Sequence, residues 1–160
     1  MPRRPVRDVM QRQVVTLRPE MSAREAERVL VGHRIGGAPV VDDAGRVVGV
    51  LTQSDLVRLD AEPPSAAAAG AFFSDVADYR DLATLPAGEH LVPVASVMSR
   101  DVLSIAPDAS LEEAARRMRE RRVHRLLVIE DGVLRGVVSA LDLLVAIDDP
   151  LTSGSKPASR

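Results

Sequence analysis

The chain contains no cysteine, so it has no disulfide, no thiolate metal ligand and no cysteine nucleophile. It has no tryptophan, and its few aromatic side chains, Phe72, Phe73 and Tyr79, lie in one short stretch, unlike the stacking platforms of single-strand nucleic-acid binders. No stretch approaches the roughly 20 apolar residues that cross a bilayer, and the N-terminus lacks the apolar run of a signal peptide. We therefore expect no membrane role and a cytoplasmic location.

Excess charge of one sign is also lacking. The 21 Lys and Arg against 23 Asp and Glu give a net charge of −2 at pH 7, which argues against a surface that attracts nucleic acid as a whole. The 46% hydrophobic and 28% charged residues are typical of a soluble globular protein. At 160 residues the chain can bury one core, or two small cores that share an interface.

What the sequence does contain is one unit written twice. The stretch that starts at Val6 returns 88 residues later at Val94, and the offset becomes 87 after Asp43 and Asp131. The matched positions are Val9/Val97, Met10/Met98, Pro19/Pro107, Ser22/Ser110, Glu25/Glu113, Gly49/Gly136 and Asp55/Asp142. Because two copies are too few for a solenoid, we expect two halves packed face to face about a pseudo-twofold axis, with a ligand cleft between them.

Each unit opens with a β-branched run that ends at a proline, which predicts strands at Val14–Leu17 and Val102–Ile105. Ser22 with Glu25, and Ser110 with Glu113, have the spacing of capping boxes, so a helix should begin at each serine. Apolar residues then recur at three- and four-residue steps in both copies, which indicates one buried helix face in each.

Short apolar runs around Asp-Asp-Ala-Gly and Glu-Asp-Gly turns predict the hairpins Ala38–Val41 with Val47–Leu51 and Leu126–Ile129 with Leu134–Val138. A last helix begins after Thr52 or Ser139. The predicted fold is therefore α/β (α+β), with two β-α-β-β-α repeats at residues 1–59 and 94–149.

Residues 60–93 have no counterpart in the repeat. Two prolines, an alanine run and Gly70 predict a linker, and FFSDVADYRDLATL then predicts an accessory helix. The acidic residues and histidine of this region fit a solvated helix face better than a metal site, because hard-metal loops need a turn glycine among the carboxylates. We expect residues 150–160 to be a disordered tail.

Two short motifs allow two interpretations. Thr52-Gln-Ser-Asp55 and Ser139-Ala-Leu-Asp142 each place a hydroxyl and a carboxylate three residues apart at a helix start, which is a capping box. The same geometry suits a nucleotide, because a hydroxyl and helix amides can face a phosphate while a carboxylate accepts from ribose hydroxyls. The residues alone leave both interpretations open.

Taken together, the motifs resemble a tandem pair of CBS (cystathionine-beta-synthase) domains, an arrangement known as a Bateman module. The resemblance covers residues 6–59 and 94–147 and rests on DVM or SVM at the start, the APVVDDAGRVVGVLT hairpin, and the closing GVLTQSD and GVVSALD. It implies a non-catalytic regulatory module that binds AMP, ADP or ATP between the repeats, and less often S-adenosylmethionine or NAD. It also implies a homodimer formed through the helices of the repeats.

The resemblance assigns each site residues from both repeats. The Asp55 site would use Thr52, Ser54 and Asp55 with Ser104, Val123, His124, Arg125 and Leu126. The Asp142 site would use Ser139 and Asp142 with Thr16, Ile35, Gly36, Ala38 and Pro39. We expect no catalytic residue, no metal ligand and no required cofactor.

The two sites are chemically unequal. The Asp55 site offers His124 and Arg125 as phosphate donors, where the other repeat has Gly36 and Gly37. We therefore expect the Asp55 site to bind a phosphorylated adenine nucleotide more tightly. His124 could equally be an edge histidine hydrogen-bonded to backbone.

Two other functions remain open at this point. The pair could be a homodimerisation scaffold with empty clefts, with a protein target that the sequence does not identify. It could also bind nucleic acid through the arginine-rich helix that begins at Leu111, although the glutamates within that helix indicate a solvated face.

Overall fold

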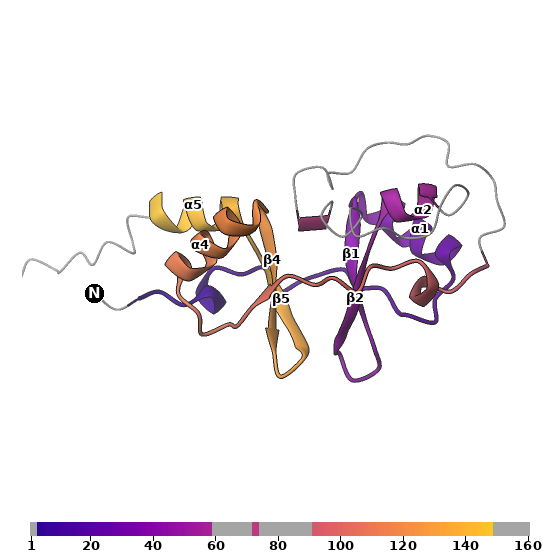
Figure 1. The fold of residues 1–160 in the computed structure, drawn as a ribbon, viewed down its shortest axis with the longest axis horizontal. Helices are drawn as coiled ribbons and strands as arrows, with labels where there is room; N and C mark the ends of the chain where they lie inside the picture. The colour runs from indigo at the N-terminus through magenta and orange to yellow at the C-terminus, as the bar shows by residue number, and fades with distance from the viewer. Residues whose placement is uncertain (1–2, 59–71, 74–90, 149–160) are drawn as a thin grey trace, which may run out of the picture.

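The two copies of the repeat form two units that lie side by side (Figure 1). The computed structural model describes residues 3–58, 72–73 and 91–148. Most of the predicted accessory helix and the predicted tail at 150–160 lie outside these residues. Within the described ranges, no helix is long and apolar enough to cross a membrane.

The element order confirms the mixed α/β fold with two repeats. The first repeat contains η1 (Val6–Asp8), α1 (Ala23–His33), β1 (Gly37–Val41), β2 (Val47–Thr52) and α2 (Gln53–Arg58). The second contains η3 (Val94–Ser96), β3 (Ser104–Ile105), α4 (Leu111–Arg121), β4 (Arg125–Glu130), β5 (Val133–Ser139) and α5 (Ala140–Asp148).

Both predicted helix starts are confirmed. Ser22 Oγ accepts from the Glu25 N–H at 3.1 Å and the Glu25 carboxylate accepts from the Ser22 N–H at 2.9 Å, a complete capping box. Ser110 caps α4 in the same way, accepting from the Glu113 N–H at 3.1 Å. The Glu113 carboxylate instead pairs with Arg117 one turn later, at 3.1 Å.

Both predicted hairpins are also confirmed, and they project on the same side of the molecule (Figure 1). β1 and β2 form a two-stranded antiparallel sheet, and β4 and β5 pair in the same way. The hairpin turns meet across the two repeats, because the Val47 N–H donates to Gly132 O and the Leu134 N–H donates to Gly45 O, each at 3.1 Å.

The strand predicted at Val14–Leu17 was wrong, whereas its counterpart is partly confirmed as β3. In the second repeat, the Leu127 N–H donates to Leu103 O at 3.0 Å and β3 runs parallel to β4. The position equivalent to Leu127 is Pro39, which has no N–H to donate. Only a bridge between Leu17 and Val40 therefore remains in the first repeat.

The opening segment of each repeat docks on the other repeat. The Val6 N–H donates to Ala109 O at 2.8 Å, and its equivalent, the Val94 N–H, donates to Met21 O at 2.7 Å. Figure 1 shows this exchange as an indigo segment against the orange repeat and a salmon segment against the violet one. Such reciprocal contacts are what a pseudo-twofold arrangement requires.

The exchange is tightest at two equivalent glycines. Gln11 and Val137 exchange backbone hydrogen bonds of 2.8 and 2.9 Å, as do Ser99 and Val50. Each crossing segment passes over a glycine of the strand it meets, Gly136 in β5 and Gly49 in β2. A Cβ at Gly136 would lie 2.5 Å from Gln11 O, and one at Gly49 would lie 2.6 Å from Ser99 O. The matched glycines of the repeat are therefore required by the crossing.

Candidate functional site

At the start of α2, Thr52 and Asp55 bond each other reciprocally. The Asp55 Oδ2 atom accepts from the Thr52 N–H at 2.8 Å and from the Thr52 hydroxyl at 3.1 Å, and the Asp55 N–H donates to Thr52 Oγ1 at 3.2 Å. The capping interpretation of this motif is therefore correct. It engages only one oxygen of the carboxylate.

The second oxygen of Asp55 is left over. The side chain is buried, and Oδ1 has no hydrogen-bond partner within the described part of the chain. Burial raises the pKa of this carboxyl above its ordinary value, and the hydrogen bonds from Thr52 and the charge of Arg58 offset that rise in part. A buried acceptor without a donor is costly, so a donor that reached Oδ1 would be bound favourably.

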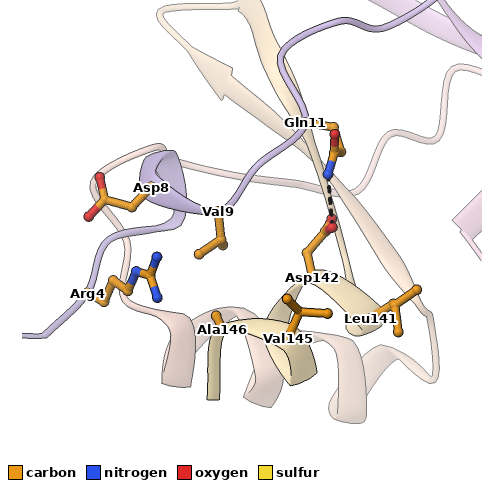
Figure 2. Close-up of a pocket in the computed structure, with 8 residues that line it drawn as sticks. All are labelled: Arg4, Asp8, Val9, Gln11, Leu141, Asp142, Val145 and Ala146. Carbon is orange, nitrogen blue, oxygen red and sulfur yellow. Dashed lines mark hydrogen bonds between the residues drawn. The ribbon is translucent and has the colours of Figure 1, made fainter. Parts of the chain in front are cut away.

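Asp142 repeats the cap but not the unpartnered oxygen. Its Oδ2 atom accepts from the Ser139 N–H at 2.8 Å, and its N–H donates to Ser139 Oγ at 3.1 Å. Its Oδ1 atom accepts from Gln11 Nε2 at 3.1 Å (Figure 2). Both oxygens of this half-buried carboxylate are thus engaged, and the two equivalent aspartates differ in what they can still bind.

A cavity of about 350 Å³ opens beside Asp142, between the N-terminal segment and α5. Figure 2 shows Arg4 on one side of it and Asp142 on the other. Its lining residues are Arg4, Asp8, Val9, Gln11, Leu141, Asp142, Val145 and Ala146. Apart from Asp142, none of them was predicted as a site residue, because no local pattern indicates that the N-terminal segment crosses to α5.

The residues before each hairpin lie beside the helix that follows it. The Gln53 N–H donates to Gly36 O at 2.9 Å, and the Ala140 N–H donates to His124 O at 2.8 Å. Each bond joins the residue before a hairpin to the start of the helix that follows the hairpin in the same repeat.

The remaining predicted residues of the Asp55 site lie along repeat 2. Ser104 pairs with Leu127, and its carbonyl accepts from Arg117 Nη1 at 2.6 Å. Val123 and Leu126 are buried in the core, whereas the side chain of His124 is exposed and that of Arg125 is half-buried. Ser54, the third residue of its motif, is half-buried in α2.

For the Asp142 site, Ala38 and Pro39 are buried in β1, and Thr16 and Ile35 are half-buried. Pro39 O accepts from the Leu17 N–H at 2.9 Å, which places Thr16 next to this strand.

Phe72 and Phe73 contact both repeats next to residues of the Asp55 site. The His124 N–H donates to Phe73 O at 2.6 Å, and the Phe72 ring lies against Gly37 of β1. Sequence reasoning placed both phenylalanines in the connector and assigned them no role. No pattern in the sequence could have placed them, because the connector has no counterpart in the repeat.

Among residues 3–58, 72–73 and 91–148, no group of three or more His, Asp or Glu side chains is placed to hold a metal ion. The acidic stretch of the connector, which we interpreted as a solvated face, lies outside these ranges.

The match to a known protein family covers both copies of the repeat. Residues 6–62 and 94–149 match the CBS domain. The CBS domain-containing protein YhcV of Bacillus subtilis is 31% identical over 140 residues, covering 88% of this chain and 83% of YhcV. The uncharacterised protein MJ1404 of Methanocaldococcus jannaschii is 30% identical over 144 residues, and there the chain spans only 32% of its relative.

Among solved structures, CBSX2 in complex with AMP has a TM-score of 0.64 and 27% sequence identity. The match covers 89% of this chain and 95% of that one.

Proposed function

This chain belongs to the CBS domain family, and we propose that it is a non-catalytic regulatory module that binds an adenine nucleotide between its two repeats. AMP, ADP or ATP is the proposed ligand, and S-adenosylmethionine and NAD are the less favoured adenosine compounds. The response is a change of conformation or assembly, which needs only a difference in affinity between two states.

The observation that carries the proposal is the buried Oδ1 atom of Asp55, which has no donor within the described residues. A carboxylate only accepts hydrogen bonds, and the vicinal hydroxyls of a ribose supply two donors. The solved structure of CBSX2 with AMP shows that a protein of this fold, 27% identical to the chain, takes this class of ligand.

The Asp55 site is the proposed tighter site. Thr52, Ser54 and Asp55 would hold the ribose, and His124 and Arg125 would face the phosphate, with Ser104, Val123 and Leu126 lining the base. A guanidinium binds phosphate through two parallel hydrogen bonds, which the glycines of the other repeat cannot supply. The Asp142 site, with Ser139, Thr16, Ile35, Gly36, Ala38 and Pro39, would bind more weakly because Gln11 already engages its carboxylate.

Titration calorimetry of the purified protein with AMP, ADP, ATP, S-adenosylmethionine and NAD tests this proposal. We expect saturable binding of at least one adenine nucleotide. A ligand at 100 times its dissociation constant would also raise the stability by about 2.7 kcal/mol. Absence of binding by every compound would leave the pair as an assembly module, and steep salt-dependent binding of duplex or RNA instead would favour the nucleic-acid interpretation.

We further propose that the protein is a homodimer that uses α5. Four apolar side chains of this helix, Leu141, Leu144, Val145 and Ile147, are between 62% and 76% exposed. A patch of this kind on one helix marks an interaction surface. A second copy presents the same apolar face, so an isologous contact would cover both at once.

The variant Ile147→Lys is expected to weaken dimerisation about 100-fold, because a lysine buried in an apolar interface loses its hydration without gaining a partner. Light scattering coupled to gel filtration measures the mass. The matched control is Leu91→Lys, which changes an equally exposed leucine outside the helices and should leave the mass unchanged. A wild-type mass of one chain at micromolar concentration would contradict the dimer.

A further inference from the structure

Phe72 and Phe73 are buried between the two repeats, with 3% and 1% of their surface exposed. Their rings pack edge to face, with centroids 4.8 Å apart and planes at 87°. They belong to a hydrophobic cluster that contains Val50 of β2 together with Ile105 and Leu126 of the second repeat. They are therefore anchored to both halves of the molecule.

The two residues contact the predicted nucleotide-binding groups. The His124 N–H donates to Phe73 O at 2.6 Å, and the Arg125 guanidinium carbon lies 5.6 Å from the centroid of the Phe72 ring, a cation–π geometry. On the other side, a Cβ built on Gly37 would lie 3.0 Å from Phe72 Cδ2 and 3.2 Å from Thr52 Cγ2. Phe72 and Thr52 thus lie against the same point of β1.

The two phenylalanines engage the groups that the proposed function assigns to the phosphate. The Phe73 carbonyl accepts from the His124 N–H, and the Phe72 ring faces the Arg125 guanidinium. A part of the chain itself therefore holds these two residues where a phosphate would need them.

We propose that Phe72 and Phe73 occupy the nucleotide position of the Asp55 site as a built-in competitor, which an adenine nucleotide displaces when it binds. This inference rests on the proposed function and adds its regulation. The measured affinity is the intrinsic affinity multiplied by the fraction of molecules in which the phenylalanines have left the site. Displacement would expose two phenyl rings, which turns occupancy of the site into a change in the protein surface.

The first test removes the competitor. Phe72→Ala/Phe73→Ala is expected to bind AMP at least about tenfold more tightly than the wild type, because open states of this kind are commonly populated at ~10% or less. Calorimetry with AMP measures the change. The control Leu30→Ala truncates a fully buried side chain of the other core cluster, and it should lower the stability without raising the affinity.

The second test needs no substitution, because the chain has only two phenylalanines. Incorporation of 4-fluorophenylalanine gives two ¹⁹F resonances, one from each residue of the proposed competitor. Saturating AMP is expected to move both resonances to the positions they have in the unfolded chain.

The outcomes separate the two proposals. AMP binding by calorimetry with unmoved ¹⁹F resonances, or with equal affinity in the double-alanine variant, overturns the competitor and leaves the proposed function in place. AMP binding by the wild type with moved ¹⁹F resonances, together with tighter binding by the double-alanine variant, supports both proposals. Binding to neither protein overturns the proposed function, and the competitor with it.

Discussion

Gly136→Ala is expected to lower the free energy of unfolding by about 3 kcal/mol, the upper end for overpacking a well-packed interior. The added Cβ would lie 2.5 Å from Gln11 O and 3.1 Å from Met10 Sδ. The first of these is a backbone oxygen that accepts from the Val137 N–H, and the Gln11 N–H donates back to Val137 O, so the segment is held at this point. The methyl group therefore displaces the N-terminal segment that docks on the second repeat.

Thermal and chemical denaturation measure this loss. Gly32→Ala is the matched control, because Gly32 lies in α1 and a Cβ there would meet nothing within 4 Å. Alanine is favoured over glycine inside a helix by roughly 0.5–1 kcal/mol, so this variant should be more stable than the wild type. Equal stabilities of the two variants would contradict the role given to the crossing segments.

Asp55→Ala is expected to weaken AMP binding about 100-fold, or about 2.7 kcal/mol. The change removes the acceptor proposed for the ribose hydroxyls, and hydrogen bonds to a charged group each contribute about 1.5–3 kcal/mol. The variant keeps the backbone bond from residue 55 to Thr52 Oγ1 but loses the carboxylate that accepts from the Thr52 N–H and hydroxyl, at a cost of about 1 kcal/mol, so its fold is checked by circular dichroism before titration.

Asp142→Ala is the equivalent variant in the other repeat, and its effect on AMP affinity should stay below about tenfold because Gln11 already bonds this carboxylate. Calorimetry on both variants compares the two sites directly. If Asp55→Ala keeps the wild-type affinity while Asp142→Ala abolishes binding, the ranking of the sites is wrong.

Elements with a local signal were predictable from the sequence. The capping serines fix where α1 and α4 begin, since hydroxyl and amide are only three residues apart. The hairpins follow from short apolar runs around tight turns. Both signals depend on neighbours in sequence, and the pseudo-twofold arrangement followed from their recurrence.

Features that depend on contacts distant in sequence were missed. The strand expected at Val14–Leu17 needs a donor in β1, and Pro39 removes it, although the proline lies more than twenty residues away. The docking of Val6 on the second repeat leaves no local pattern either. The Arg4 side of the cavity near Asp142 was missed for the same reason.

The two motifs of the candidate site were predictable from the sequence, but the burial and hydrogen-bond partners of their aspartates were not. Sequence alone could not separate a cap from a ligand site, and both aspartates prove to be caps. Their inequality comes from partners elsewhere in the chain, namely Gln11 at Asp142 and the buried surroundings of Asp55. The place of Phe72 and Phe73 could not be derived either, because nothing in the repeat corresponds to the connector.

The central claim is that an adenine nucleotide binds between the repeats through the two aspartates. Calorimetric titration of AMP into the wild type and into the Asp55→Ala/Asp142→Ala double variant tests it most directly. We predict saturable binding to the wild type and none to a folded double variant. Binding of equal strength by both proteins, or by neither, would contradict the claim.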